Sequence, residues 1–405
     1  MPEKKPKSRF FKYAAINFTF FITNSLGGYV IVFLQSIGFN AQQVGMITAL
    51  DSGVGVFSTP FWGMLSDKLR SWKKIIALTL VLGAGLFFLI PASSRISFGN
   101  ISFLFIFIPI AMFFKAPTMS LLENWMLRNS AAEKLNYGAL RAFGALSYAI
   151  ASIALGYILP KTGVAFTFYA NAVLTIPALL MVLFIKGSAG EELAGKKQLT
   201  FKEMQIGQLL KNYYLMAYII FSIFQRIPFL CSMRFLPFLV DEIGGDIAQM
   251  GIILGLRAFV EIPMMLLLKP LRQKIPLYYL IVIASSFFMV ECIMYSFANS
   301  FGAVVAVSIL HGIGNGFMLT TGSSYVFMLA PDHLKTTSQT VLGSMTSIAG
   351  ILGGLLGGAF IEILGIKQFY LTIGIMIFVA LILFILSFFV GEKILGIKRP
   401  GLSLG

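Results

Sequence analysis

The polar stretch KGSAGEELAGKKQLTFKEMQIGQ, residues 186–208, divides the chain into two halves that are built mainly from apolar runs. A helical run of about 20 apolar residues crosses the ~30 Å hydrocarbon core of a bilayer. Six such runs precede the stretch, near residues 10–36, 42–65, 73–93, 100–127, 136–160 and 164–186. Six more follow it, near residues 209–240, 246–269, 276–299, 301–330, 337–364 and 368–391. The pattern predicts an all-α membrane protein with 12 transmembrane helices.

The two halves predict two domains of six helices each. The N-terminal six-helix bundle is expected over residues 1–186, a cytoplasmic linker over 187–208, and the C-terminal six-helix bundle over 209–405. A duplicated six-helix unit is typical of transporters built from two related halves. A short internal similarity, between residues 125–144 and 327–350, is consistent with such a duplication.

The composition also indicates a membrane protein. Hydrophobic residues make up 58% of the chain and charged residues 12%, with a mean hydropathy of +0.87; soluble domains have roughly 45–50% and about 25%. The net charge of +15 comes from short basic clusters between apolar runs, which does not indicate a nucleic-acid partner. No nucleotide-binding loop or metal-ligand cluster is present, so we expect no cofactor, no metal and no enzymatic activity.

The lysines and arginines predict the orientation of the chain. If both termini, the linker and the alternate loops share one side, that side holds 23 of them, and the opposite side holds only Arg95, Lys161 and Lys367. Because positively charged loops stay in the cytoplasm, both termini are expected there, in a multi-pass protein of the cell membrane.

The segment FWGMLSDKLRSWKK, residues 61–74, lies between the second and third runs. It resembles the loop signature of the major facilitator superfamily, G-x-x-x-D-R/K-x-G-R/K-R/K, at Gly63, Asp67 and Lys68 and at the final lysine pair. The resemblance implies the major facilitator fold and assigns these three residues to a cytoplasmic gate. The second glycine of the signature is missing, and the corresponding loop of the second half lacks the Gly and the Asp.

The stretch EKLNYGALRAFGALSYAIASIALG, residues 133–156, extends the resemblance. With the loop at 61–74 it is similar to the lactose permease and to related proton symporters of aromatic acids and nucleosides. The resemblance implies that Glu123 and Arg141 hold the solute and that Tyr148 stacks on it. It also places His311 on that family's tenth-helix histidine, whereas Ser308 and Gly314 stand where a lysine and the proton-carrying glutamate are found.

Glu123 and Arg141 are each nine residues from position 132, the middle of a short polar turn. On two antiparallel helices they are therefore expected at similar depth, where they can meet. An ionisable side chain in the middle of a span costs about 2.5–3.5 kcal/mol on insertion scales, which favours a functional role. The alternative is a structural clamp near the cytoplasmic rim.

Three residues of the second half are candidates for proton coupling: Glu261, Glu291 and His311. Glu261 lies four residues after Arg257, so the two charges can instead neutralise each other on one helical face. Glu291 is deep in the ninth run, where burial favours the neutral acid, although a hydrogen-bonded structural acid is equally consistent. An imidazole in general titrates near neutral pH, which makes His311 a candidate proton carrier; the alternative is a hydrogen bond that joins two helices.

The other charged residues within spans have no assigned role. Arg226 and Arg234 flank IPFLCSM in the seventh run, where each can attract an anionic solute, and Arg234 can also reach Asp241 or Glu242. Lys115, in FFKAPT, has no partner nearby in the sequence and is expected to face a cavity. The glycine run GILGGLLGGAF in the eleventh run favours close helix packing.

These features predict a secondary active transporter that moves a small polar or anionic organic solute by alternating access, as a monomeric proton symporter. The expected partners are the solute, the proton and the lipid bilayer, with no nucleic acid. Proton-driven efflux of amphiphilic compounds is the alternative on the same fold. A membrane receptor or enzyme is a third possibility, against which the sequence offers no catalytic motif and no effector domain.

Overall fold

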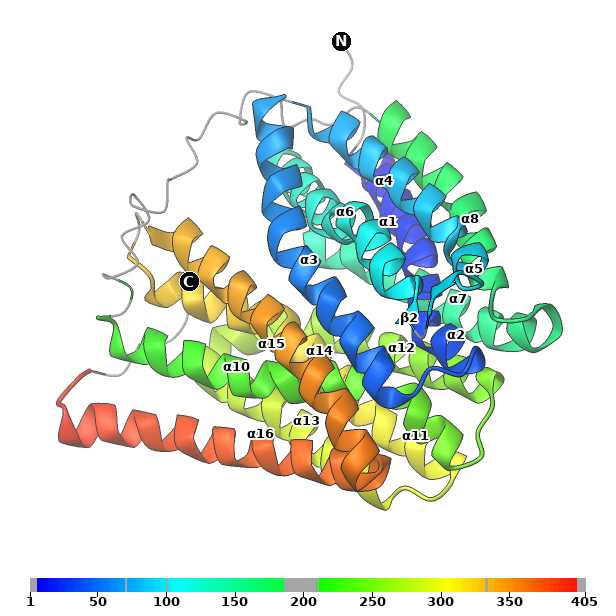
Figure 1. The fold of residues 1–405 in the computed structure, drawn as a ribbon. Coiled ribbons are helices and arrows are strands. Elements are labelled where there is room, and N and C mark those ends of the chain that lie inside the picture. The colour runs from blue at the N-terminus through cyan, green and yellow to red at the C-terminus, as the bar shows by residue number, and fades with distance from the viewer. Residues whose placement is uncertain are drawn as a thin grey trace, which may run out of the picture. The chain divides into compact units, whose positions relative to one another are not determined.

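The computed structural model describes residues 6–69, 71–99, 101–185, 209, 211–331 and 334–398, and helices dominate it (Figure 1). The expected linker, residues 187–208, lies outside these residues. The chain divides into two compact units. The first comprises Met1–Asn40, Met46–Gln198 and Ile247–Ala258, and the second comprises Ala41–Gly45, Leu199–Asp246 and Phe259–Gly405.

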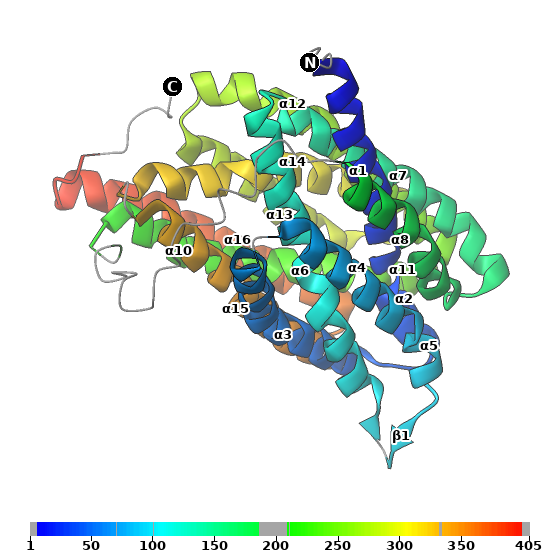
Figure 2. The same ribbon diagram turned by 90° about the horizontal axis from the view of Figure 1, so that it is seen from above.

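The helices of the N-terminal half coincide with the first six predicted runs. They are α1 (Pro6–Gly27), α2 (Val30–Ser36), α3 (Ala41–Lys68), α4 (Trp72–Phe88), α5 (Ile90–Ser93), α6 (Leu104–Ala132), α7 (Tyr137–Thr162) and α8 (Phe166–Phe184). A short antiparallel hairpin, β1 (Ser97–Phe98) with β2 (Ile101–Ser102), pairs Ser97 with Ser102 and precedes α6. Figure 2 shows this hairpin projecting beyond the end of α6.

The helices of the C-terminal half coincide with the last six predicted runs. They are α10 (Tyr213–Arg234), α11 (Leu236–Glu242), α12 (Ile247–Lys274), α13 (Leu277–Phe297), α14 (Phe301–Leu329), α15 (Lys335–Leu364), α16 (Ile366–Phe389) and a final π-helical turn, η3 (Val390–Ile394). The seventh run forms two helices, because Pro237, the second residue of α11, has no backbone N–H to continue the hydrogen bonds of α10.

Ten helical stretches of the described residues are long and apolar enough to cross a membrane. The two predicted runs outside this set, residues 42–65 and 73–93, are also helical, as α3 with 28 residues and α4 with 17 followed by α5. The prediction of an all-α membrane protein is therefore confirmed.

The first unit packs α1 against α7 and α8, and α4 against α6 and α8 (Figures 1 and 2). A cluster of buried aromatic and aliphatic side chains, which includes Tyr13, Trp62 and Trp125, fills the space between these helices. Pro117 of α6 has no N–H for the carbonyl of Phe113, four residues earlier. The Trp62 indole donates to that carbonyl at 3.0 Å, so α3 supplies the hydrogen bond that the proline cannot.

The second unit packs α13 against α14 and α16, and α10 against α15 and α16. Phe221 and Phe384 stack at 4.3 Å between ring centroids, which joins α10 to α16. The predicted close packing of the glycine run is confirmed in α15. A side-chain carbon at Gly353 or Gly357 would lie 3.2 or 3.1 Å from the sulfur of Cys231 on α10.

The contact between α13 and α16 yields a stability prediction at Gly374. A Cβ at this position would lie 2.7 Å from Ile293 Cγ1 and 3.1 Å from the Ile293 backbone nitrogen. We expect Gly374→Val to lower the free energy of unfolding by about 2–3 kcal/mol through overpacking, measured as thermal unfolding in detergent. Gly85→Val on α4 is the matched control, since a Cβ there meets no atom within 4 Å. Equal stability of the two variants would contradict the close approach of the helices.

Candidate functional site

The hairpin of α6 and α7 brings Glu123 and Arg141 together. The Asn136 side chain accepts a hydrogen bond from the Ala139 N–H at 3.3 Å and caps the start of α7, which fixes where the second arm begins. Arg141 Nε lies 3.4 Å from Glu123 Oε1. The Arg141 side chain is 11% exposed and that of Glu123 is 37% exposed. The pair is thus mostly enclosed, with its carboxylate partly accessible.

Aromatic side chains surround this ion pair. The Arg141 guanidinium lies over the ring of Phe21 on α1, 4.0 Å from its centroid, in the geometry of a cation–π contact. Tyr148 follows Arg141 by seven residues, two helical turns, and is therefore on nearly the same face of α7. Its hydroxyl would lie 3.2 Å from a Cβ built on Gly28. The solute residues expected from the resemblance therefore lie in one part of the first unit.

Sequence reasoning missed Phe21 and Tyr137 in this cluster. The charges of Glu123 and Arg141 both act on the Tyr137 side chain. Tyr137 precedes Arg141 by four residues, so the sequence could have placed it beside Arg141 on one face of the helix. Phe21 is one of 40 phenylalanines, and nothing in the sequence distinguishes it from residues that face lipid.

In the second unit, Glu291 of α13 and His311 of α14 form a buried pair. His311 Nδ1 lies 3.0 and 3.1 Å from the two carboxylate oxygens of Glu291. Glu291 is 0% and His311 4% exposed. The Ser232 hydroxyl of α10 donates to Glu291 Oε1 at 3.4 Å, and the Phe229 ring stacks on the imidazole at 5.5 Å between centroids. An acid and a base thus share one enclosed position.

The contact between Glu291 and His311 was not predicted from the sequence. Glu291 and His311 lie on consecutive helices, eight and twelve residues from residue 299, the middle of the turn between α13 and α14. Their positions on one hairpin could have suggested the contact, although they are not at matched distances from the turn.

Glu261, the third expected proton-coupling residue, lies on α12. The amide nitrogen of Asn315 on α14 donates to Glu261 Oε2 at 3.0 Å. Asn315 follows His311 by four residues, so the two residues occupy adjacent turns of α14. Glu291 therefore contacts α14 at His311 and Glu261 contacts it at Asn315, one helical turn further along.

The expected gate motif lies at the end of α3 and the start of α4. Gly63 and Lys68 are in α3, and Lys68 is exposed; Asp67 is also in α3, but its side chain lies outside the described part of the structure. Further along the motif, Lys73 donates from Nζ to the Leu183 carbonyl at the end of α8 at 3.1 Å. A cation at a helix C-terminus is favourable, so Lys73 links α4 to α8.

The two arginines of α10 have different surroundings. Arg234 donates from Nη1 to the Gly350 carbonyl of α15 at 2.7 Å. The Arg226 guanidinium lies 5.4 Å from the centroid of the Phe229 ring. Among the described residues no carboxylate forms an ion pair with Arg226.

Comparison with known proteins gives consistent results. The model of the "MFS_1 like family" matches residues 10–372. The chain is 25% identical over 346 residues to an uncharacterized transporter, YwbF, of Bacillus subtilis, which covers 83% of this chain and 82% of that protein. It is 24% identical over 376 residues to a maltose permease of Geobacillus stearothermophilus, with 91% of each chain covered. Among solved structures, a mutant form of the nucleoside transporter NupG matches with a TM-score of 0.78 at 19% identity, over 94% of this chain and 99% of that one.

Proposed function

The chain belongs to the MFS_1 like family of the major facilitator superfamily, and from this premise we propose that it imports a small polar or anionic organic solute as a proton symporter. Secondary transporters of this kind expose one binding site to each side of the membrane in turn. The relatives are named for a sugar, in the maltose permease, and for nucleosides, in NupG. Both classes carry several hydroxyl groups on a ring, which defines the solutes to test first.

The observation that carries this proposal is the ion pair of Glu123 and Arg141. A carboxylate only accepts hydrogen bonds and a guanidinium only donates them, so the pair at 3.4 Å offers both partners that a hydroxyl group needs. The 37% exposure of the Glu123 side chain leaves acceptor capacity for a solute. Tyr148, two turns along α7, adds an aromatic surface for the face of a sugar or base ring.

Proton coupling is proposed for the buried pair of Glu291 and His311. A carboxylate and an imidazole at 3.0 Å form a coupled pair that can gain or lose one proton, which changes the net charge of the pair by one. Ser232 and the ring of Phe229 hold the two groups in place. A change in their protonation must favour one orientation of the transporter over the other for the gradient to drive transport.

Uptake by proteoliposomes tests the proposed function. The panel contains maltose, glucose, uridine, adenosine and glucuronate, with an imposed pH gradient that is acid outside. We expect accumulation of at least one solute, abolished when the gradient is collapsed by a protonophore. If the acid-outside gradient instead drives every accepted solute out in exchange for protons, and none is taken up, efflux replaces import.

Arg226 yields a prediction on solute binding. Because a guanidinium stays charged and Arg226 has no carboxylate in an ion pair among the described residues, we expect it to bind an electronegative group of the solute. Arg226→Gln should raise KM about tenfold while leaving the melting temperature unchanged, and Arg226→Lys should recover part of the affinity.

Arg234→Gln is the matched control for Arg226→Gln. It removes a donor to the Gly350 carbonyl, and is therefore expected to lower the melting temperature rather than to raise KM selectively. A normal KM in Arg226→Gln would exclude Arg226 from the binding site.

A further inference from the structure

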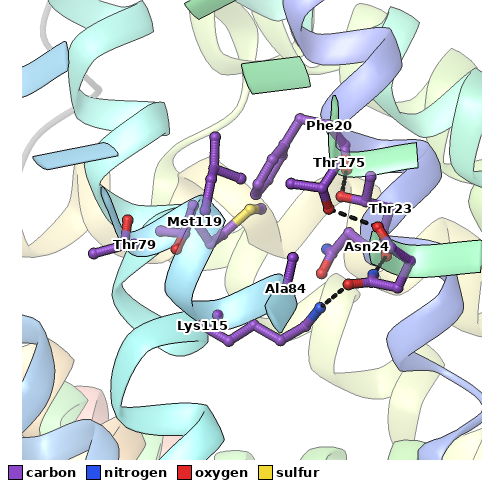
Figure 3. Close-up of a pocket in the computed structure, with 12 residues that line it drawn as sticks. Phe20, Thr23, Asn24, Thr79, Ala84, Lys115, Met119 and Thr175 are labelled. Atoms are coloured by element: carbon purple, nitrogen blue, oxygen red, sulfur yellow. Dashed lines mark hydrogen bonds between the residues drawn. The ribbon is translucent and has the colours of Figure 1, made fainter. Parts of the chain in front are cut away.

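Lys115, in the middle of α6, extends into the interior of the first unit. Its Nζ donates to Asn171 Oδ1 on α8 at 3.1 Å and lies 3.9 Å from the centroid of the Phe87 ring on α4. The Asn171 amide in turn donates to the Thr23 carbonyl on α1 at 2.8 Å. Figure 3 shows the lysine side chain lying along a cavity with the bond to Asn171 at its tip. The position of the ammonium group is thus fixed by three neighbouring helices.

Among the residues that the structure describes, no carboxylate pairs with Lys115. The residues that line the cavity come from α1, α4, α6 and α8, and Lys115 is the only ionisable one among them. An amide oxygen and an aromatic face stabilise an ammonium group, but they do not neutralise it. A lysine at this depth in a span either releases its proton or takes a partner that compensates its charge.

The size of the cavity limits what this partner can be. Its volume is about 40 Å³, and one water molecule needs roughly 10–15 Å³ of such space. A few water molecules or one small ion fit in this space.

The lining side chains provide donors for an anion. The Lys115 ammonium has three N–H groups, of which one is bonded to Asn171. The amide group of Asn24, on the cavity wall, adds two more (Figure 3). The hydroxyls of Thr118 and Thr175 now donate to backbone carbonyls of their own helices, and they become additional donors on rotation. Water alone would fill the space but would leave the positive charge uncompensated.

We propose that this cavity binds a small monovalent inorganic anion of the chloride class as the counter-ion of Lys115. The ammonium group and the Asn24 amide contact the anion, and Asn171 keeps the lysine in position. The negative charge of the anion then balances the positive charge of Lys115, as a carboxylate would. The anion is a structural ligand of the helices α1, α4, α6 and α8, and its binding does not depend on which solute is transported.

Thermal unfolding of the full-length protein in detergent tests the proposal. Sodium chloride or bromide is compared with sodium gluconate at equal pH and ionic strength. A specific anion site should raise the melting temperature by about 2–4 °C in chloride and bromide. Lys115→Met should abolish this difference, and Lys161→Met, at the exposed end of α7, should retain it. Equal melting temperatures in all three salts, or a difference that persists in Lys115→Met, would overturn the proposal.

A second measurement decides the matter if Lys115→Met fails to fold. Chloride-35 NMR of the wild-type protein should show excess line width that bromide displaces, because bound chloride relaxes faster than free chloride. Asn24→Leu should weaken chloride binding at least tenfold while the protein remains folded. An absence of displaceable broadening in the wild type would show that the cavity holds only water. Neither readout involves transport, so failure here and failure of the symport assay are distinguishable.

Discussion

Replacing Arg141 by glutamine is expected to reduce solute uptake by at least about two orders of magnitude. The substitution leaves Glu123 without its partner at 3.4 Å and removes the cation over Phe21. Removing one member of a fully buried ion pair costs about 3–5 kcal/mol; because the Glu123 side chain is 37% exposed, solvent reduces this cost, and the main loss is that of the Arg141 donor to the solute. Glu123→Gln should have an effect of similar size. The measurement is initial uptake rate together with solute binding in detergent, for both variants.

The chain contains a control of equal geometry for this ion pair. Arg9 Nη1 also lies 3.4 Å from a carboxylate oxygen, that of Glu133; the Arg9 side chain is 46% exposed and the Glu133 side chain 6%. Glu133 keeps a hydrogen bond from the Tyr13 hydroxyl when Arg9 is replaced, and neither residue is proposed to hold the solute, so Arg9→Gln should leave uptake within about twofold of the wild type. If Glu123→Gln and Arg141→Gln fold stably and transport every accepted solute as fast as Arg9→Gln does, the pair is a structural clamp.

The positions of the helices along the chain were largely predictable, because they follow from the lengths of the apolar runs. Each of the twelve runs read from the sequence coincides with helices. The contact between Glu123 and Arg141 was also predictable, because a tight turn joins the two helices and sets the depth of each residue on both arms. Lys115 shows where this reasoning ends. Its partner Asn171 is 56 residues away on α8, which does not follow α6 directly in the chain.

Packing between helices that are not consecutive determines such contacts, and it depends on how side chains interlock around the whole unit. The hydrogen bond from Asn315 to Glu261, over 54 residues, is a second example. From the sequence, Arg257 is a possible partner of Glu261 because the two are four residues apart, whereas nothing in the sequence points to Asn315. The aromatic contacts of Arg141 and His311 were hidden for another reason, since an abundance of phenylalanine is also what lipid-facing helices require.

Glu291→Gln is expected to abolish accumulation driven by a pH gradient while solute exchange across the membrane continues. Glutamine has nearly the shape of the protonated acid and can keep hydrogen bonds to Ser232 and His311, so the pocket should remain folded. It cannot release a proton, however, and a gradient can act only on a group whose protonation changes during the cycle. Accumulation should fall at least about tenfold, whereas exchange of internal for external solute should persist and lose its dependence on pH.

Two comparisons separate this coupling role from a structural one. His311→Gln should also impair accumulation, because the imidazole is the base that faces both carboxylate oxygens at 3.0 and 3.1 Å. Glu242→Gln removes an exposed acid at the end of α11 and should leave accumulation unchanged. A purely structural pair would lower the melting temperature and slow exchange and accumulation in parallel. If Glu291→Gln accumulates solute as the wild type does, the proton is carried elsewhere, and Glu261, which is bonded to Asn315 one turn along α14, becomes the residue to replace.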